Sequence, residues 1–283
     1  GSPPVTDDER GSEEVRERNL SGIKPMEKLL RVENLGVHYG TVRALYETTF
    51  ELGTGSICGL IGMNGSGKST LFKAIMGVIP AHTGTVEIAG KEPYLARKNG
   101  IVSYVPQSEE IDWSFPVSVR EVVAMGRYRG LGITRRLRAT DKQAVEHALE
   151  RVELTELAHR QIGALSGGQR KRAFVARAIA QGARLLLLDE PFAGVDKRSE
   201  SMLIQVLKQM RSEGATVLVS THDLASLRAF ADDALLLRQT ILMHDTPQAV
   251  LAPENLVQAF GMQVQAGADS GASDEQTWRE KGE

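Results

Sequence analysis

Residues 62–70, GMNGSGKST, have the residue types and the spacing to hold a chain of phosphates. They fit the pattern G-x-x-x-x-G-K-[ST] from Gly62 to Ser69. Glycines in this pattern permit a tight turn that points successive backbone N–H groups at an anion. We expect Lys68 to reach the β- and γ-phosphates of a nucleotide and the Ser69 hydroxyl to bind Mg²⁺. The alternative is a chance glycine-rich turn.

The segments on either side predict the elements that would position this loop. Residues 56–61 (SICGLI) are apolar and predict a buried strand, and residues 71–79 (LFKAIMGVI) predict a helix whose N-terminus faces the anion. Strand, loop and helix thus come in the order that phosphate binding requires, which argues against the chance turn.

Two carboxylates follow another apolar run. Asp189 and Glu190 come directly after the four leucines of residues 185–188, at the carboxyl end of a predicted buried strand. Ligands of open α/β sheets bind at that edge. We expect Asp189 to hold Mg²⁺ through water and Glu190 to orient and deprotonate an attacking water. The alternative is a helix N-cap, which Pro191 partly supports.

Two other polar residues follow predicted strands. Gln107 comes after residues 101–105 (IVSYV) and Pro106, and His222 comes after residues 215–220 (ATVLVS). At this edge of a sheet, Gln107 could sense the γ-phosphate or Mg²⁺, or it could be an ordinary loop residue. His222 could hydrogen-bond to the γ-phosphate, although a single histidine usually has a structural role.

A second helix N-terminus suited to an anion follows residues 165–169, LSGGQ. Ser166 is the expected N-cap, and Gly167 and Gly168 lie in the first turn.

Tyr39 lies in a segment that predicts an antiparallel hairpin, because residues 29–51 alternate apolar and polar side chains around a turn at Gly40. Its ring could stack on a purine or pack as an ordinary strand residue, and the segment alone favours the ordinary role.

Residues 107–164 predict a mostly helical insertion between strands of an α/β core. Ser118 and Glu121 have the spacing of a capping box. Residues 141–159 have the apolar period of an amphipathic helix that ends before Arg160.

Two clusters of side chains in this insertion, one aromatic and one of arginines, suggest surfaces that could contact a partner. Trp113, Phe115 and Pro116 stand together among acidic residues, where aromatic side chains favour a contact surface over a core. Residues 127–138 hold five arginines, which could bind nucleic acid or anionic lipid. The cluster is short and has no interleaved aromatics, which favours a solvated linker.

Composition excludes several classes of protein. The 283 residues carry a formal net charge of −2, without the basic balance of a nucleic-acid-binding protein, and 41% of them are hydrophobic, which suits a globular core. The single cysteine, Cys58, excludes a disulfide framework, and we expect it to be a small core residue.

The ends of the chain and its apolar runs carry further expectations. No run of about 18 apolar residues suggests a membrane span, and the polar N-terminus does not resemble a signal peptide. Residues 1–27 and 263–283 predict disordered segments. The six histidines are scattered and match no metal-binding motif.

Five motifs in one order resemble those of the ATP-binding cassette (ABC) ATPases: GMNGSGKST, Gln107 after VSYVP, LSGGQ, LLLLDE and STHD. The resemblance covers residues 29–260, and LSGGQ directly upstream of a strand ending in Asp-Glu is highly specific for the family. It implies an α/β fold, with a P-loop NTPase (RecA-like) core, an antiparallel β subdomain and an inserted α-helical subdomain. The ATPase domain would span residues 28–262, with the helical subdomain at about 107–180.

The resemblance also implies a role for each motif residue. Glu190, His222 and Lys68 would carry catalysis, and Ser69, Gln107 and Asp189 would hold Mg²⁺. Residues 166–169 would contact the γ-phosphate of ATP held by a second protomer. The implied ATP-binding set, in which Tyr39 now stacks on adenine, is Tyr39, Gly62, Asn64, Gly65, Ser66, Gly67, Lys68, Ser69, Thr70, Gln107, Ser166, Gly167, Gly168, Gln169 and Asp196.

The stretch QSEEIDWSFPVSVREVVAMGRY resembles the ATPases of bacterial manganese, zinc and iron importers, the manganese type most closely. In these, a loop after the glutamine meets a coupling helix of the membrane subunit. The resemblance implies ATP and Mg²⁺ as cofactors, and an ATPase bound at the cytoplasmic face of the bacterial plasma membrane. The implied partners are a second copy in a head-to-tail dimer, permease subunits and, indirectly, an extracytoplasmic metal-binding protein. No nucleic-acid partner is implied. The alternatives are an ABC ATPase of another transporter type and a non-transport ABC ATPase.

Overall fold

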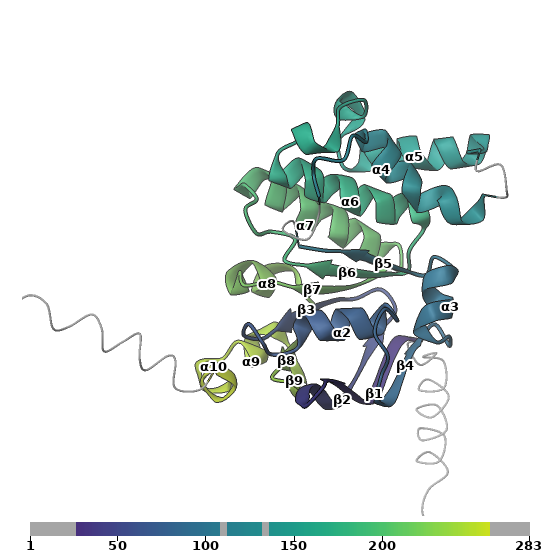
Figure 1. The fold of residues 1–283 in the computed structure, drawn as a ribbon. Helices are drawn as coiled ribbons and strands as arrows, with labels where there is room; N and C mark the ends of the chain where they lie inside the picture. Colours follow the sequence, from purple (N-terminus) through teal and green to yellow (C-terminus); the bar gives the residue numbers. More distant parts are fainter. Residues whose placement is uncertain (1–26, 108–111, 132–135, 261–283) are drawn as a thin grey trace, which may run out of the picture.

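The computed structural model describes residues 27–107, 112–131 and 136–260 (Figure 1). Apart from Glu27, the two segments expected to be disordered, 1–27 and 263–283, lie outside these residues. So do residues 108–111 of the loop after Gln107 and Arg135 of the arginine cluster.

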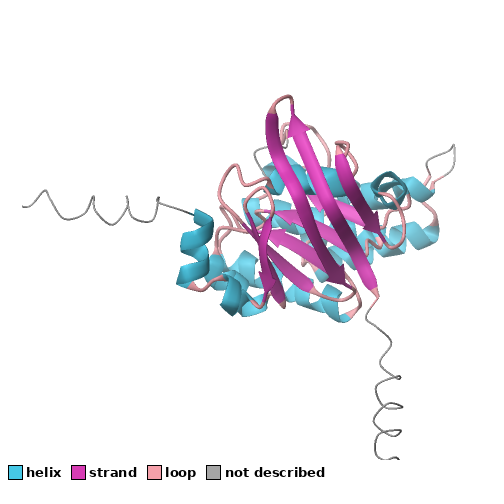
Figure 2. Cartoon of the chain, turned by 90° about the horizontal axis from the view of Figure 1, so that it is seen from below, coloured by secondary structure: helices cyan, strands magenta, loops and turns pink. Residues whose placement is uncertain are grey.

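Two sheets form the frame of the fold (Figures 1 and 2). The smaller is antiparallel, in the order β2-β1-β4, and the larger has the order β5-β6-β7-β3-β8-β9. In the larger sheet β5, β6, β7, β3 and β8 pair in parallel, and β9 is antiparallel to β8. The strands are β1 Lys28–Tyr39, β2 Val42–Gly53, β3 Ile57–Ile61, β4 Thr83–Ile88, β5 Val102–Val105, β6 Leu185–Asp189, β7 Thr216–Ser220, β8 Asp233–Leu237 and β9 Ile241–Asp245.

The larger sheet is covered on both faces, which explains why β3, β6 and β7 are buried along their whole length. Helix α2 (Lys68–Ile75) lies between the two sheets, where Leu71 and Phe72 share one core with strands of both. Helices α6 (Gly167–Gln181) and α7 (Lys197–Ser212) pack in the core on the other face.

Between β5 and β6 the described chain is mostly helical, in line with the insertion predicted there. Helices α4 (Val119–Ala124) and α5 (Ala139–Arg151) pack on α6 and on each other. The remaining helices are α3 Pro93–Lys98, α8 Leu224–Phe230, α9 Pro247–Val250, α10 Pro253–Phe260 and the 3₁₀-helices η2 Met125–Gly130, η3 Thr155–Leu157 and η4 Ile162–Ala164. None of the described helices has both the length and the apolar character to cross a bilayer.

Several element ends differ from the predictions for physical reasons. Helix α2 begins at Lys68 and not at Leu71, because the phosphate loop runs directly into its first turn. The helix predicted over residues 141–159 ends at Arg151, and Glu153 takes a φ of +56°, which ends the helical path. Residues 247–260 form two helices and not one, since Pro253 cannot donate the hydrogen bond that would continue the first.

The aromatic cluster divides between core and surface. Trp113 packs edge-on against Phe174, with 5.7 Å between ring centroids, and the guanidinium of Arg170 lies 4.5 Å from its centroid. Phe115, two residues on, is 62% exposed. The expected contact surface therefore rests on Phe115, whereas Trp113 holds its loop on α6.

Arg127 has a structural role that the solvated-linker interpretation does not include. Its Nε donates to Asp141 Oδ1 at 2.8 Å and its Nη1 donates to the carbonyl oxygen of Ala180 at 3.1 Å, so it joins α5 to α6. The backbone N–H of Arg138 donates to Asp141 Oδ2 at 3.0 Å. That backbone hydrogen bond and then the one from Arg127 lower the pKa of the Asp141 carboxyl.

We predict that Asp141→Asn lowers the midpoint of urea unfolding at pH 7. Because the carboxyl pKa is lower in the folded than in the unfolded chain, this stabilisation is complete above about pH 4 and is lost as the pH falls through the folded pKa. The difference between variant and wild type should therefore shrink in acid. Glu146→Gln is the control, since its partner Arg120 is exposed and such pairs contribute little; an equal loss in both variants would contradict the assignment.

Candidate functional site

The phosphate loop connects β3 to α2. Gly65 has a φ of +83°, and Gly67, the N-cap of α2, has a φ of +101°. Glycine adopts this left-handed region without the steric cost that a Cβ brings. The N–H groups in the first turn of α2 have no acceptor within the helix, which leaves them available to an anion.

The start of the phosphate loop packs against Ser66 of the same loop and against β8 of the larger sheet. A Cβ on Gly62 would lie 2.4 Å from Ser66 Oγ and 2.7 Å from the carbonyl oxygen of Leu237. Gly62 and Ser66 are both buried, whereas Asn64 and Ser69 are exposed. The loop thus has an inner layer that sets its shape and an outer layer that can meet a ligand.

Lys68 is folded back over this loop. Its Nζ donates to the carbonyl oxygen of Gly62 and, at 3.1 Å, to that of Met63. Burial lowers the pKa of the ammonium group, and the nearby Glu190 and Asp189 oppose that shift. A bound phosphate would give the ammonium a charged partner in place of two carbonyls.

A cleft of about 320 Å³ beside the loop collects several of the predicted residues. Backbone N–H groups and an ammonium suit phosphates, and the hydroxyl, amide and carboxylate oxygens in the same cleft suit a hard divalent cation. The residues present therefore fit a nucleoside triphosphate with Mg²⁺. The lining consists of Val42, Arg43, Ala44, Met63, Asn64, Gly65, Gly67, Lys68, Ser69, Thr70, Gln107, Asp189 and Gln239.

Asp189, at the end of β6, is held by three donors. The Ser220 hydroxyl donates to Oδ1 at 2.7 Å, the Gln107 amide approaches the same oxygen at 3.4 Å, and the Tyr104 hydroxyl donates to Oδ2 at 3.2 Å. A carboxylate fixed in this way has one orientation toward the cleft, which is what a metal-binding carboxylate requires.

Glu190 is held in a strained conformation beside it. Its φ of +48° lies in the left-handed region, and its N–H donates to the carbonyl oxygen of Ser220 at 3.1 Å. Strain of this kind persists where the surrounding structure enforces it, often at functional sites. His222 Nε2 lies 3.1 Å from Glu190 Oε1, and the His222 backbone N–H donates to Oε2 at 3.3 Å. The two predicted catalytic side chains are therefore in contact.

The motif at residues 166–169 lies apart from this cleft, whose described lining contains none of the four. Ser166 and Gln169 form a capping box, in which Ser166 Oγ accepts from the Gln169 N–H at 3.2 Å and Gln169 Oε1 accepts from the Ser166 N–H at 2.9 Å. Ser166 and Gly167 are exposed. Within this chain the motif therefore does not meet the residues of the phosphate loop.

Asp196 and Gly168 belong to a close contact between α6 and α7. A Cβ on Gly168 would lie 2.5 Å from Ser199 Cβ, so only glycine permits the approach. Asp196 is the N-cap of α7 and accepts from the Ser199 N–H at 3.0 Å. In this chain Asp196 has a capping role, and its predicted role toward ATP stays a prediction.

Tyr39 also lies outside the described lining of the cleft. It ends β1 beside the hairpin turn and is 50% exposed. Val42, Arg43 and Ala44, which follow that turn, do line the cleft. The hairpin is therefore next to the site, and stacking of the Tyr39 ring on a base stays a prediction.

Sequence reasoning missed three residues that position the site. Ser220 and Tyr104 hold Asp189, and Gln239 holds the phosphate loop. The Gln239 N–H donates to the carbonyl oxygen of Ser66 at 2.7 Å and its Nε2 donates to that of Gly65 at 3.0 Å. Ser220 stands in the last predicted strand before His222, which was a usable signal. No pattern in the sequence connects Gln239 with a loop so distant in the chain.

Comparison with known proteins supports a nucleotide-binding role for this cleft. The family model described as "ABC transporter" matches residues 45–193. The manganese transport system ATP-binding protein MntA of Synechocystis sp. is 48% identical over 233 residues, which cover 82% of this chain and 90% of that protein. The chelated iron transport system membrane protein YfeB of Yersinia pestis is also 48% identical over 233 residues, covering 82% of this chain and 79% of that protein.

Among solved structures, a metal-chelate type ABC transporter in an inward-facing conformation is similar to this chain. The sequences are 32% identical, the TM-score is 0.73, and the match covers 83% of this chain and 89% of that one.

We predict that Gly67→Ala weakens nucleotide binding at least tenfold. A Cβ there would lie 2.7 Å from Leu45 Cδ2 and 2.8 Å from the carbonyl oxygen of Ala44, and the loop would have to move. Gly90→Ala is the control, because Gly90 also has a positive φ, +75°, but has open space around it and lies outside the cleft. Equilibrium titration with a fluorescent ATP analogue measures the affinity of each variant and of the wild type. An affinity of Gly67→Ala equal to that of Gly90→Ala would refute the prediction.

Proposed function

The chain belongs to the ABC transporter family, and on that premise we propose that it powers a bacterial importer of a divalent metal ion, with manganese as the first candidate and zinc or iron next. Membership itself makes the chain an ATP-binding ATPase that works with membrane permease partners. The observation that carries the metal assignment is the 48% sequence identity to each of two proteins, one named for manganese transport and the other for chelated iron transport.

The residues of the cleft support Mg²⁺ as the cofactor. Ser69, Gln107 and Asp189 present a hydroxyl, an amide and an oriented carboxylate within one cleft. When bound, Mg²⁺ would neutralise charge on the phosphates. The carboxylate is already oriented by Ser220 and Tyr104, so little side-chain freedom would be lost on binding.

For hydrolysis, this chain would supply Glu190 as a base and the Lys68 ammonium as a positive charge. The Glu190 side chain is 8% exposed and lies next to His222. Its carboxylate would accept a proton from a water that approaches the γ-phosphate. Lys68 supplies a positive charge from the loop, and His222 can hydrogen-bond to the γ-phosphate. Phosphoryl transfer depends mostly on such positioning and charge stabilisation.

The position of the LSGGQ motif supports a head-to-tail dimer. Ser166 and Gly167 are exposed and stand apart from the chain's own phosphate loop. A helix N-terminus of this kind attracts anions. In a dimer the motif of each copy would face the γ-phosphate bound by the other, and nucleotide would join the two copies.

We predict that Glu190→Gln reduces ATP hydrolysis by at least about 10²-fold but leaves ATP binding intact, because the amide keeps the shape and cannot accept the proton. ATP-bound dimer should then accumulate, which gel filtration with and without ATP would detect. Turnover close to that of the wild type would exclude Glu190 as the base, and a variant that stays monomeric with ATP would contradict the dimer.

Coupling to a permease would use the loop that precedes α4. Phe115 is the exposed aromatic of this loop, and Trp113 anchors the loop on α6. A permease helix that contacts Phe115 would thereby be connected with α6, whose N-terminus carries the LSGGQ motif. The ATPase would bind peripherally at the cytoplasmic face of the plasma membrane, and an extracytoplasmic metal-binding protein would deliver the ion to the permease.

The proposal is tested in liposomes with a complex assembled from this chain and the permease and metal-binding protein that co-purify with it. We predict ATP-dependent uptake of Mn²⁺, and a several-fold loss of uptake in Phe115→Ala with basal ATPase activity unchanged. Val257→Ala on α10 is the control, an exposed apolar residue on a helix far from α4 in Figure 1. Stimulation by a non-metal solute, or no metal uptake with an active ATPase, would reject metal import.

A further inference from the structure

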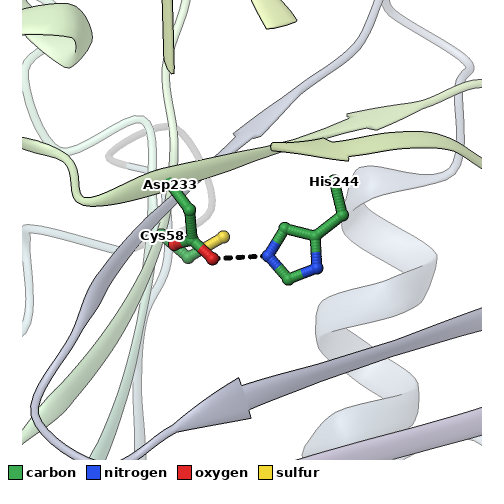
Figure 3. Close-up of side chains that lie close together, drawn as sticks. All are labelled: Cys58, Asp233 and His244. Atoms are coloured by element: carbon green, nitrogen blue, oxygen red, sulfur yellow. Dashed lines mark hydrogen bonds and ion pairs between the residues drawn. The ribbon is translucent and has the colours of Figure 1, made fainter. Parts of the chain in front are cut away.

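A cysteine, an aspartate and a histidine from three strands meet at the base of the β8–β9 hairpin (Figure 3). Cys58 lies in β3, Asp233 begins β8 beside it in parallel register, and His244 comes from β9. Cys58 Sγ, an Asp233 oxygen and a His244 ring nitrogen all lie within 4.8 Å of one another. No role in the ATP cleft draws on these side chains.

The strand pairing explains why the three side chains converge. Cys58 is the Cα partner of Asp233, and His244 is the partner of Leu235, two residues further along β8. Side chains two residues apart on a strand point to the same face of the sheet. The cluster is thus fixed by the backbone of three paired strands and not by flexible loops.

We propose that Cys58, Asp233 and His244 form a binding site for Zn²⁺ or a similar thiolate-preferring divalent metal ion, separate from the Mg²⁺–ATP cleft. A thiolate, an imidazole and a carboxylate are the three ligand types that zinc takes in proteins, with a water completing a tetrahedron. Metal–ligand bonds of about 2.0–2.3 Å place tetrahedral ligand atoms about 3.5 Å apart, so side-chain shifts of about an ångström suffice.

The surroundings support metal entry. Cys58 is fully buried, whereas the His244 and Asp233 side chains are 30% and 31% exposed, so the ligands run from the interior to the surface. His244 Nε2 hydrogen-bonds to Asp233 Oδ2, which orients the ring toward the cluster. The other carboxylate oxygen, Oδ1, is buried and has no hydrogen-bond partner among the described residues. An ion bound by Oδ2 would take the place of the histidine–aspartate contact.

Binding would require the Cys58 thiol to lose its proton to solvent. Burial, and then the charge of Asp233, raise the pKa of that thiol well above its usual range. The neutral thiol therefore costs little in the apo state, and the ion must supply the interaction that stabilises the thiolate.

The cluster lies on the strands that hold the phosphate loop. From Cys58, β3 continues to Ile61 and the chain then enters the loop at Gly62, about 13 Å from Cys58 at the usual rise of a strand. The turn between β8 and β9 carries Gln239, which donates to the carbonyl oxygens of Gly65 and Ser66. An ion at the cluster would cross-link β3 with this hairpin and stabilise the frame of the loop.

The test is titration of the metal-free full-length chain with Co²⁺ and then Zn²⁺. Cys58 is the single cysteine of the sequence, so a cobalt–thiolate charge-transfer band can report only on this residue. We expect the band to reach one cobalt per chain and to be removed by Zn²⁺. Zinc at about 100 times its Kd should raise Tm by about 5–10 °C.

Matched variants separate this site from other metal-binding groups. His244→Gln, at a partly exposed position where the fold should persist, is expected to weaken zinc at least tenfold, and Cys58→Ala to remove the thiolate band. His82→Ala is the control, because the centroids of the His38 and His82 rings lie 3.7 Å apart and this histidine pair could bind the added metal instead. Absence of a thiolate band in wild type, an unchanged affinity in His244→Gln, or a loss confined to His82→Ala would each overturn the proposal. Because these readouts require no ATP or transport, the site can fail or stand independently of the importer function.

Discussion

Parallel pairing of β3, β6 and β7 is the constraint on which the site depends. The three strands come from distant parts of the chain, and pairing brings their carboxyl ends to one edge. That edge then carries the phosphate loop after β3, Asp189 and Glu190 at the end of β6, and His222 after β7. The strands can pair in this way because both faces of the sheet are buried and most of their side chains are apolar, with Asp189 and Ser220 at the ends of β6 and β7.

Ser220 shows how closely neighbouring strands are coupled at this edge. Its hydroxyl donates to Asp189, and its carbonyl oxygen accepts from the Glu190 N–H, so one residue of β7 orients both carboxylates. The second contact holds Glu190 at a positive φ, a conformation that costs free energy and that an isolated chain would leave. The geometry of Glu190 and of Asp189 is thus a property of the sheet and not of the Asp-Glu pair alone.

The LSGGQ motif does not line the cleft of its own chain. The LSGGQ helix terminus presents exposed groups suited to an anion, yet its own chain's phosphate loop is elsewhere. Helix α6, which begins at that motif, contacts the anchored Trp113 loop and, through Arg127 and Asp141, helix α5. A movement of the helical insertion would therefore carry the motif with it. In the proposed dimer, closure of the two copies around nucleotide and movement of the permease would be linked through contacts that exist only in one state.

Local motifs were enough to predict the nucleotide chemistry, because the motif residues stand next to one another or directly after strongly apolar strands. The α/β fold, the family and most element positions followed from the same local patterns, which depend on near neighbours. Tertiary structure alone decided that Ser220 and Tyr104 orient Asp189, that Gln239 supports the phosphate loop, that Arg127 joins two helices, and that Cys58 meets Asp233 and His244. These contacts join residues far apart in the chain, and only the register of paired strands and packed helices sets them, which no local pattern encodes.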